Sequence, residues 1–327
     1  MNERNPRVRT PLLATVAALL FGIAQGGAAQ TLAYVPNQKS GTISVIDTGT
    51  DTVVRTLEAK GAFGKRLQQI AVDAAGKQLY VVDAAHNRLS VVDIATDAIT
   101  RSVEIEEDAE GVTIAPDGKT LAVCVEGSHH VLIVDAATLA IRANITTQGR
   151  NPEHCAFSPD GTLLVTSNEG TGDLDVIDVA AAKSVGLIKV SGHPRGMGFL
   201  PGTHTLYVAQ ETANVVDVVD LDARAKLKSI PTALRAAGVA VAPDGKHVYV
   251  SNGGAGSVSI VDVAKGESIA EITVGQRPWN PALTPDGKKL YVANGRSNSV
   301  SVIDLATRTV VKEIAVGEMP WGVIIGR

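Results

Sequence analysis

The chain has 327 residues, and 45% of them are hydrophobic, which is enough to bury a large core and too many for an intrinsically disordered chain. Aromatic residues make up only 3%, which argues against a sugar-binding cleft or a base-stacking platform, since both depend on aromatic faces. The net charge of −4 supplies no basic field, so we do not expect nucleic acid as a partner.

The first 29 residues have the pattern of a secretory signal peptide. Arg4, Arg7 and Arg9 precede an apolar run from Pro11 to Ala24, which is too short for a membrane-spanning helix, and small residues stand near Ala29. An uncleaved membrane anchor is the weaker alternative. We therefore predict a signal peptide over residues 1–29 and a single domain over residues 30–327. We expect a periplasmic or secreted protein with no membrane span after cleavage.

The rest of the sequence is one unit repeated seven times. The phrase APDGKTLAVCV recurs as SPDGTLLVTSN, APDGKHVYVSN and TPDGKKLYVAN, and each copy is followed by a second phrase that ends in aspartate. These aspartates recur about every 42 residues. They are Asp47, Asp93, Asp135, Asp178, Asp220, Asp262 and Asp304.

Each unit contains four short runs rich in Val and Ile, such as GVAVA, HVYVS, SVSIV and SIAEITV in the sixth unit. Alternating runs separated by Gly, Pro and Asp are typical of strands, and four strands in this period are typical of a propeller blade. The repeats begin with a second strand, LAYVP, and end after a first strand at Gly322–Gly326. We therefore predict an all-β fold, a seven-bladed β-propeller of four-stranded antiparallel blades. The C-terminal strand should join three N-terminal strands and close the ring.

The repeat resembles that of a known family. LYVAN at 290–294, which leads to Val-Ile-Asp, and VYVSN at 248–252, which leads to Ile-Val-Asp, are similar to the YVTN-type β-propeller repeat of secreted bacterial and archaeal proteins. The resemblance implies a seven-bladed propeller outside the cytoplasm, related to lactonase-like and surface-layer propellers. It supplies no catalytic motif for this sequence.

One position of the repeat varies where structural positions stay constant. In successive units it holds Gln68, Glu110, Glu153, Arg195, Ala237, Trp279 and Trp321, and the next position includes His154 and Asn280. Equivalent positions of a propeller encircle one channel mouth, and variable loops on a rigid scaffold commonly bind ligands. We predict a ligand-binding ring of Gln68, Glu110, Glu153, Arg195, Trp279, Asn280 and Trp321. The alternative for the tryptophans is packing within the repeat.

Histidines and charged residues of neighbouring units map to the same mouth, and four interpretations stay open. A metal site would use His130, His154 and His193, with Glu153 as a carboxylate ligand. A lactone-hydrolysing site would use His154 or Glu153 as the base and Arg195 to stabilise the oxyanion. An anion-binding site that uses the arginines is the third interpretation, and a solvated loop surface is the fourth. We assign no role to His204 and His247, which flank turns on the opposite side.

The sequence predicts the ligand poorly. The primary hypothesis is a non-enzymatic periplasmic binding or scaffold protein that binds a small ligand or a protein partner at the channel mouth. The alternatives are a lactonase-like hydrolase and an accessory protein of a periplasmic redox or metal pathway. The sequence does not identify a cofactor, and a divalent metal is one alternative. We expect the protein to be a monomer.

The two cysteines fall in adjacent units. Counting the alternation of side chains around the hairpins indicates that Cys124 and Cys155 point the same way around the ring. We therefore expect two small buried hydrophobic residues, with a disulfide between them as the weaker alternative.

Overall fold

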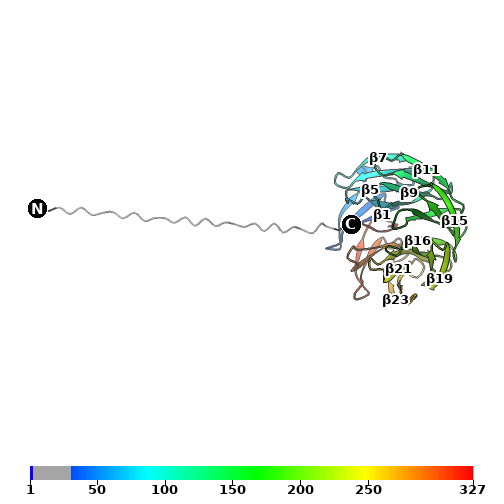
Figure 1. The fold of residues 1–327 in the computed structure, drawn as a ribbon. Coiled ribbons are helices and arrows are strands. Elements are labelled where there is room, and N and C mark those ends of the chain that lie inside the picture. Colours follow the sequence, from blue (N-terminus) through cyan, green and yellow to red (C-terminus); the bar gives the residue numbers. More distant parts are fainter. Residues whose placement is uncertain (3–30, 327) are drawn as a thin grey trace. The chain divides into compact units, whose positions relative to one another are not determined.

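In the computed structural model, which describes residues 1–2 and 31–326, the strands form seven four-stranded antiparallel sheets (Figure 1). The all-β, seven-bladed prediction is confirmed. Residues 3–29 of the predicted signal peptide lie outside the described residues. Within the described residues, no helix has the length and apolar character needed to cross a membrane.

We number the blades 1 to 7 from the N-terminal end of the ring and give the strands from the channel outwards. The innermost strands, in blade order, are β28 (Ile324–Ile325), β4 (Leu67–Val72), β8 (Ala109–Ile114), β12 (Pro152–Phe157), β16 (Pro194–Phe199), β20 (Ala236–Val241) and β24 (Pro278–Leu283). The second strands are β1 (Leu32–Asn37), β5 (Gln78–Asp83), β9 (Thr120–Val125), β13 (Leu163–Asn168), β17 (Thr205–Gln210), β21 (His247–Asn252) and β25 (Lys289–Asn294). The third strands are β2 (Thr42–Asp47), β6 (Arg88–Asp93), β10 (His130–Asp135), β14 (Asp173–Asp178), β18 (Val215–Asp220), β22 (Ser257–Asp262) and β26 (Ser299–Asp304). The outer strands are β3 (Thr52–Leu57), β7 (Ala98–Glu104), β11 (Ile141–Thr146), β15 (Lys183–Lys189), β19 (Ala225–Pro231), β23 (Glu267–Thr273) and β27 (Thr309–Ala315). A short 3-10 helix, η1 (Ala59–Gly61), follows β3.

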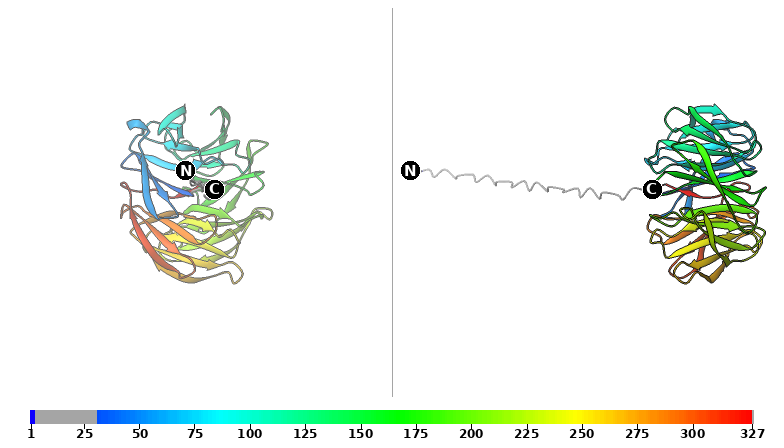
Figure 2. Two further views of the ribbon diagram at one scale, coloured as in Figure 1. Left: turned by 90° about the vertical axis from the view of Figure 1, so that its left-hand side faces the viewer. Right: turned by 45° about the vertical axis from the view of Figure 1, so that its right-hand side comes forward.

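The C-terminal strand closes the ring as predicted. Strand β28 pairs antiparallel with β1, with Ile324 opposite Tyr34, and the backbone N–H of Trp321 donates to the carbonyl of Pro36 at 2.9 Å. A parallel bridge from Gly322 to Asn280 ties the same segment to blade 7. The red C-terminal segment accordingly lies beside the blue first strands in both ribbon views (Figures 1 and 2).

The repeated residues maintain the turns and the core. The side-chain amide of Asn294 donates to the hydroxyls of Ser299 and Ser301, at 3.2 and 2.8 Å, and so holds the turn between β25 and β26. A Cβ at Gly275 would lie 2.6 Å from Cγ of Asn294, so only glycine lets the preceding loop pack on this amide. The five tyrosines are at most 5% exposed. They belong to apolar clusters that fill the spaces between neighbouring blades.

The expectation for the cysteines was wrong, because Cys124 and Cys155 form a disulfide between blades 3 and 4. Residues directly opposite each other in a strand pair share a face of the sheet. The counterpart of Cys155 in blade 3 is Val112, which lies opposite Val123. Cys124 is the next residue, so it points to the other face, toward blade 4, where Cys155 meets it. The count of side-chain alternation was out by one residue.

Candidate functional site

The variable ring residues lie at an irregular point of the inner strands. In every inner strand from β4 to β24, the pairing register with the second strand shifts at the ring position, as between Pro152 and His154 in β12. Such bulges re-aim side chains away from the regular alternation of a strand. The bulges therefore turn the ring side chains toward the mouth of the channel.

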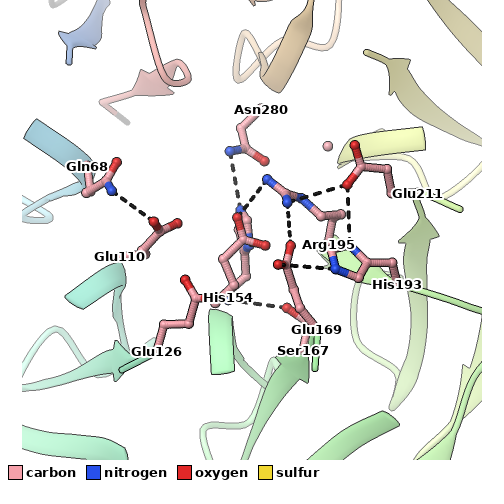
Figure 3. A network of polar contacts seen from close by, with 12 residues as sticks. Gln68, Glu110, Glu126, His154, Ser167, Glu169, His193, Arg195, Glu211 and Asn280 are labelled. Carbon is pink, nitrogen blue, oxygen red and sulfur yellow. Dashed lines mark hydrogen bonds and ion pairs between the residues drawn. The ribbon is translucent and has the colours of Figure 1, made fainter. Parts of the chain in front are cut away.

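Arg195 is the centre of an ion-pair network at the mouth. Its Nη2 lies 2.7 Å from Oε1 of Glu153. Its Nη1 pairs with Glu169 and, at 3.5 Å, with Oε2 of Glu211 (Figure 3). The side chain of Arg195 is 18% exposed, and those of Glu153 and Glu211 are 3% and 5% exposed. A guanidinium buried to this extent is stable only with carboxylate partners, so these residues form one unit.

The ion-pair network continues toward blades 6 and 7. Oε1 of Glu211 lies 2.6 Å from Nη2 of Arg235 and 3.2 Å from Nη2 of Arg277. The guanidinium of Arg277 is in turn 6.0 Å from the ring centroid of Trp279, within the range of a cation–π contact. Positive and negative groups thus alternate across four blades.

The carboxyl groups of the mouth differ in ionisation. Burial disfavours the charged form of Glu153, but His154 and Arg195 outweigh it and lower the pKa of Glu153. Burial and the neighbouring Glu153 raise the pKa of Glu169 to about 10. Burial, Glu153 and Glu126 raise the pKa of Glu110 to about 8. At neutral pH, Glu153 is therefore ionised, whereas Glu169 and Glu110 hold protons.

His154 joins residues from opposite sides of the ring. Its Nδ1 lies 3.3 Å from Oε2 of Glu153, and its Nε2 lies 3.4 Å from the amide nitrogen of Asn280 in blade 7. Its ring stacks on Trp321 of the closing segment, with centroids 5.3 Å apart and planes inclined by 23°. The cavity that these side chains enclose with Arg195 has a volume of about 10 Å³. It holds at most one water molecule.

The predicted ligand-binding residues form two groups at the mouth. Gln68 donates to Oε1 of Glu110 at 3.0 Å on blades 2 and 3, and Gln68 itself accepts a hydrogen bond from Gln38 at 2.8 Å. The second group is Glu153, Arg195, Trp279, Asn280 and Trp321, which surround His154. The predicted catalytic residues Glu153, His154 and Arg195 are thus in mutual contact.

The predicted metal ligands are divided between different partners. His130 lies 2.8 Å from Oε2 of Glu106, and His154 contacts Glu153 and Asn280. Among residues 31–326, one group of three donor side chains converges within 4.8 Å, namely Glu169, His193 and Glu211. Arg195 already contacts both of these carboxyl groups, so a cation bound there would have to displace it.

Sequence reasoning missed Glu211, Arg235 and Arg277. Glu211 follows the last residue of β17, as Glu169 follows that of β13 and Glu126 that of β9. Aligning this second position across the units, in addition to the ring position, would have found it.

The comparisons with known proteins agree with this architecture. The model of the family described as "Lactonase, 7-bladed beta-propeller" matches residues 180–318. The chain is a seven-bladed β-propeller, consistent with the YVTN-like repeat. No curated protein matches it.

Several solved structures resemble this seven-bladed propeller. Hydrazine synthase of Kuenenia stuttgartiensis is 24% identical with a TM-score of 0.76, over 84% of this chain and 92% of that one. A functionally unknown protein from Desulfotomaculum acetoxidans DSM 771 is 16% identical with a TM-score of 0.79, over 90% and 99%. Dihydro-heme d1 dehydrogenase NirN in complex with DHE is 15% identical with a TM-score of 0.67, over 90% and 74%. At these identities the likeness shows the fold alone.

Proposed function

We propose that this propeller is an exported binding protein without catalytic activity, and that its channel mouth docks a protein partner. The observation that carries the proposal is that the side chains at the mouth contact one another and leave almost no space for a ligand. Arg195 is held by the carboxyl groups of three glutamates, and the cavity beside His154 holds at most one water molecule. The mouth is therefore a filled, charged surface and not a hollow site.

The rim of the mouth has the composition of a protein interface. Leu234, in the loop between β19 and β20, is 55% exposed, and the neighbouring side chain of Arg235 is 50% exposed. Arg277 and Trp279 form the adjoining surface. Arginine and tryptophan in one patch are typical of the energetically dominant part of an interface, and Leu234 lies beside them.

A matched pair of leucine variants tests the docking surface. Leu234→Asp changes the rim of the mouth, and Leu227→Asp changes an equally exposed leucine, 57% against 55%, on the outer strand β19 of the same blade. Immobilised wild-type protein and both variants are incubated with a periplasmic extract, and retained proteins are quantified by mass spectrometry. We expect one protein that wild type and Leu227→Asp retain and Leu234→Asp loses by about tenfold or more. If no retained protein shows this pattern, the docking surface is not at this rim.

The match to the lactonase family supports one alternative, a hydrolase in which Glu153 or His154 is the base and Arg195 binds the oxyanion. The geometry disfavours it, because an oxyanion would have to displace the carboxyl groups of Glu153 and Glu169 from Arg195. Turnover of a lactone panel by wild type that His154→Ala abolishes would overturn the non-enzymatic proposal. We expect no such turnover.

The proposed export rests on the N-terminal pattern, and a periplasmic or secreted location is tested by cell fractionation with N-terminal sequencing. An intact N-terminus in the cytoplasmic fraction would contradict it.

The group of Glu169, His193 and Glu211 supports an accessory role in a metal pathway. Stoichiometric metal in purified protein, lost in His193→Ala, would favour that role over the docking proposal.

A further inference from the structure

A pocket of about 420 Å³ opens on the side of the ring opposite the mouth, between blades 6 and 7. The turns that precede β21 and β25 and the turn that follows β26 surround it. Tyr249, Ile260 and Leu305 contribute apolar walls, and His247 and Arg308 contribute donors. Both the volume and the mixture of apolar walls with a few polar groups are typical of small-molecule sites, which occupy about 300–1,000 Å³.

The equivalent groove between blades 7 and 1 shows why this pocket stays open. There, the same repeat positions hold Lys289, Tyr291 and Asp51. Nζ of Lys289 lies 2.7 Å from Oδ2 of Asp51, and the hydroxyl of Tyr291 also donates to Asp51. This carboxylate draws the three side chains together across the groove.

Between blades 6 and 7, none of the three equivalent positions holds a carboxylate. His247 stands in the place of Lys289, Tyr249 in that of Tyr291, and Arg308 in that of Asp51. An imidazole and a guanidinium cannot form the ion pair that closes the other groove. Within residues 31–326, the side chain of Arg308 and the hydroxyl of Tyr249 have no ion pair or hydrogen bond.

The acidic residues around the pocket are already engaged in their own turns. Asp286 accepts hydrogen bonds from the hydroxyl of Thr284 at 2.7 Å and from the backbone of Lys288 at 3.1 Å. Asp304 accepts from the backbone and the hydroxyl of Thr307, at 2.8 and 3.0 Å. Asp244 accepts from the backbone of Lys246 at 3.0 Å. These bonds hold one oxygen of each carboxylate, Oδ1, in its own turn, whereas the pocket-lining Arg308 and the hydroxyl of Tyr249 are donors without a partner among residues 31–326.

We infer that the pocket between blades 6 and 7 binds a small organic anion. Its carboxylate takes the place that Asp51 has in the neighbouring groove, with Arg308 and the hydroxyl of Tyr249 as donors. Its compact apolar body lies against Ile260 and Leu305. A guanidinium matches a carboxylate with two parallel hydrogen bonds, which makes Arg308 the main determinant of affinity.

The test uses benzoate as the probe and isothermal titration calorimetry of the purified protein. Arg308→Gln removes the cation, and Arg224→Gln is the control at the equivalent position of blade 5, where the guanidinium donates to the carbonyl of Val185 at 2.7 Å. We expect benzoate to bind wild type and Arg224→Gln alike, and Arg308→Gln to weaken binding by about tenfold or more. No binding to wild type, or equal binding to Arg308→Gln, would overturn the inference.

A double variant tests whether an ion pair across the pocket excludes the ligand carboxylate. His247→Lys with Arg308→Asp transfers the ion pair of the neighbouring groove into this one. We expect this variant to lose benzoate binding while its melting temperature stays at or above that of wild type. Retained binding in the double variant would refute the assignment. Inorganic phosphate that binds wild type as tightly as benzoate would refute the role of the apolar walls.

Discussion

Breaking the disulfide between Cys124 and Cys155 should lower the free energy of unfolding of this propeller. The two cysteines are 31 residues apart in the sequence. A cross-link that closes a loop of this length removes about 3.7 kcal/mol of chain entropy from the unfolded state at room temperature. Both residues are buried, Cys124 fully and Cys155 with 6% exposure, so replacement by alanine adds a packing loss of about 1 kcal/mol.

The measurement is urea unfolding followed by the fluorescence of the two tryptophans. Three samples separate the effects: oxidised wild type, wild type refolded in reductant, and Cys124→Ala with Cys155→Ala. The covalent contribution is the difference between the first two, and the packing contribution is the difference between the last two. If the double variant unfolds at the same urea concentration as oxidised wild type, the chain-entropy argument fails for this protein.

Three further predictions concern the ring closure and the mouth. Deleting residues 321–327 removes β28 and leaves an edge of β1 unpaired, so size-exclusion chromatography should show aggregates; unchanged elution and melting would contradict the closure argument. Arg195→Met should lower the free energy of unfolding by about 3–5 kcal/mol, because its buried carboxylates lose their partner, and a thermal melt like that of wild type would contradict this. The pKa of Glu110 is raised from 4.5 to about 8, so the folded state binds a proton more tightly than the unfolded state, and wild-type stability should fall as the pH rises through this window. Glu110→Gln should flatten the fall in urea-unfolding free energies, and an unaltered pH slope would show that Glu110 is not its source.

The fold could be predicted because the same contacts recur in every blade, with the period of the sequence repeat. Each blade contacts its neighbours through equivalent positions, so a periodic aspartate and a fixed tyrosine position define the blade count and the packing. The same symmetry brought Glu153, His154 and Arg195 together, since equivalent positions encircle one axis.

Contacts that depend on side-chain direction could not be predicted in the same way. The disulfide depends on which face of a strand Cys124 occupies, and an error of one residue reverses that face. The partners of Arg195 include Glu169 and Glu211, which come from loops after the second strands, and no periodicity fixes the rotamers that join them. The donors of the pocket between blades 6 and 7 become visible only beside the closed groove of Lys289 and Asp51.

The pairing of β28 with β1 also has a kinetic consequence. Tyr34 and Ile324 meet although nearly the whole chain separates them, whereas the other strand pairs of each blade join neighbours in sequence. Local hairpins form in microseconds, but a contact of such high sequence separation must wait until the intervening segments are ordered. The pairing of β28 with β1, which completes blade 1, should therefore be the last to form. Until then, the unclosed propeller exposes unpaired strand edges through which partly folded chains can aggregate.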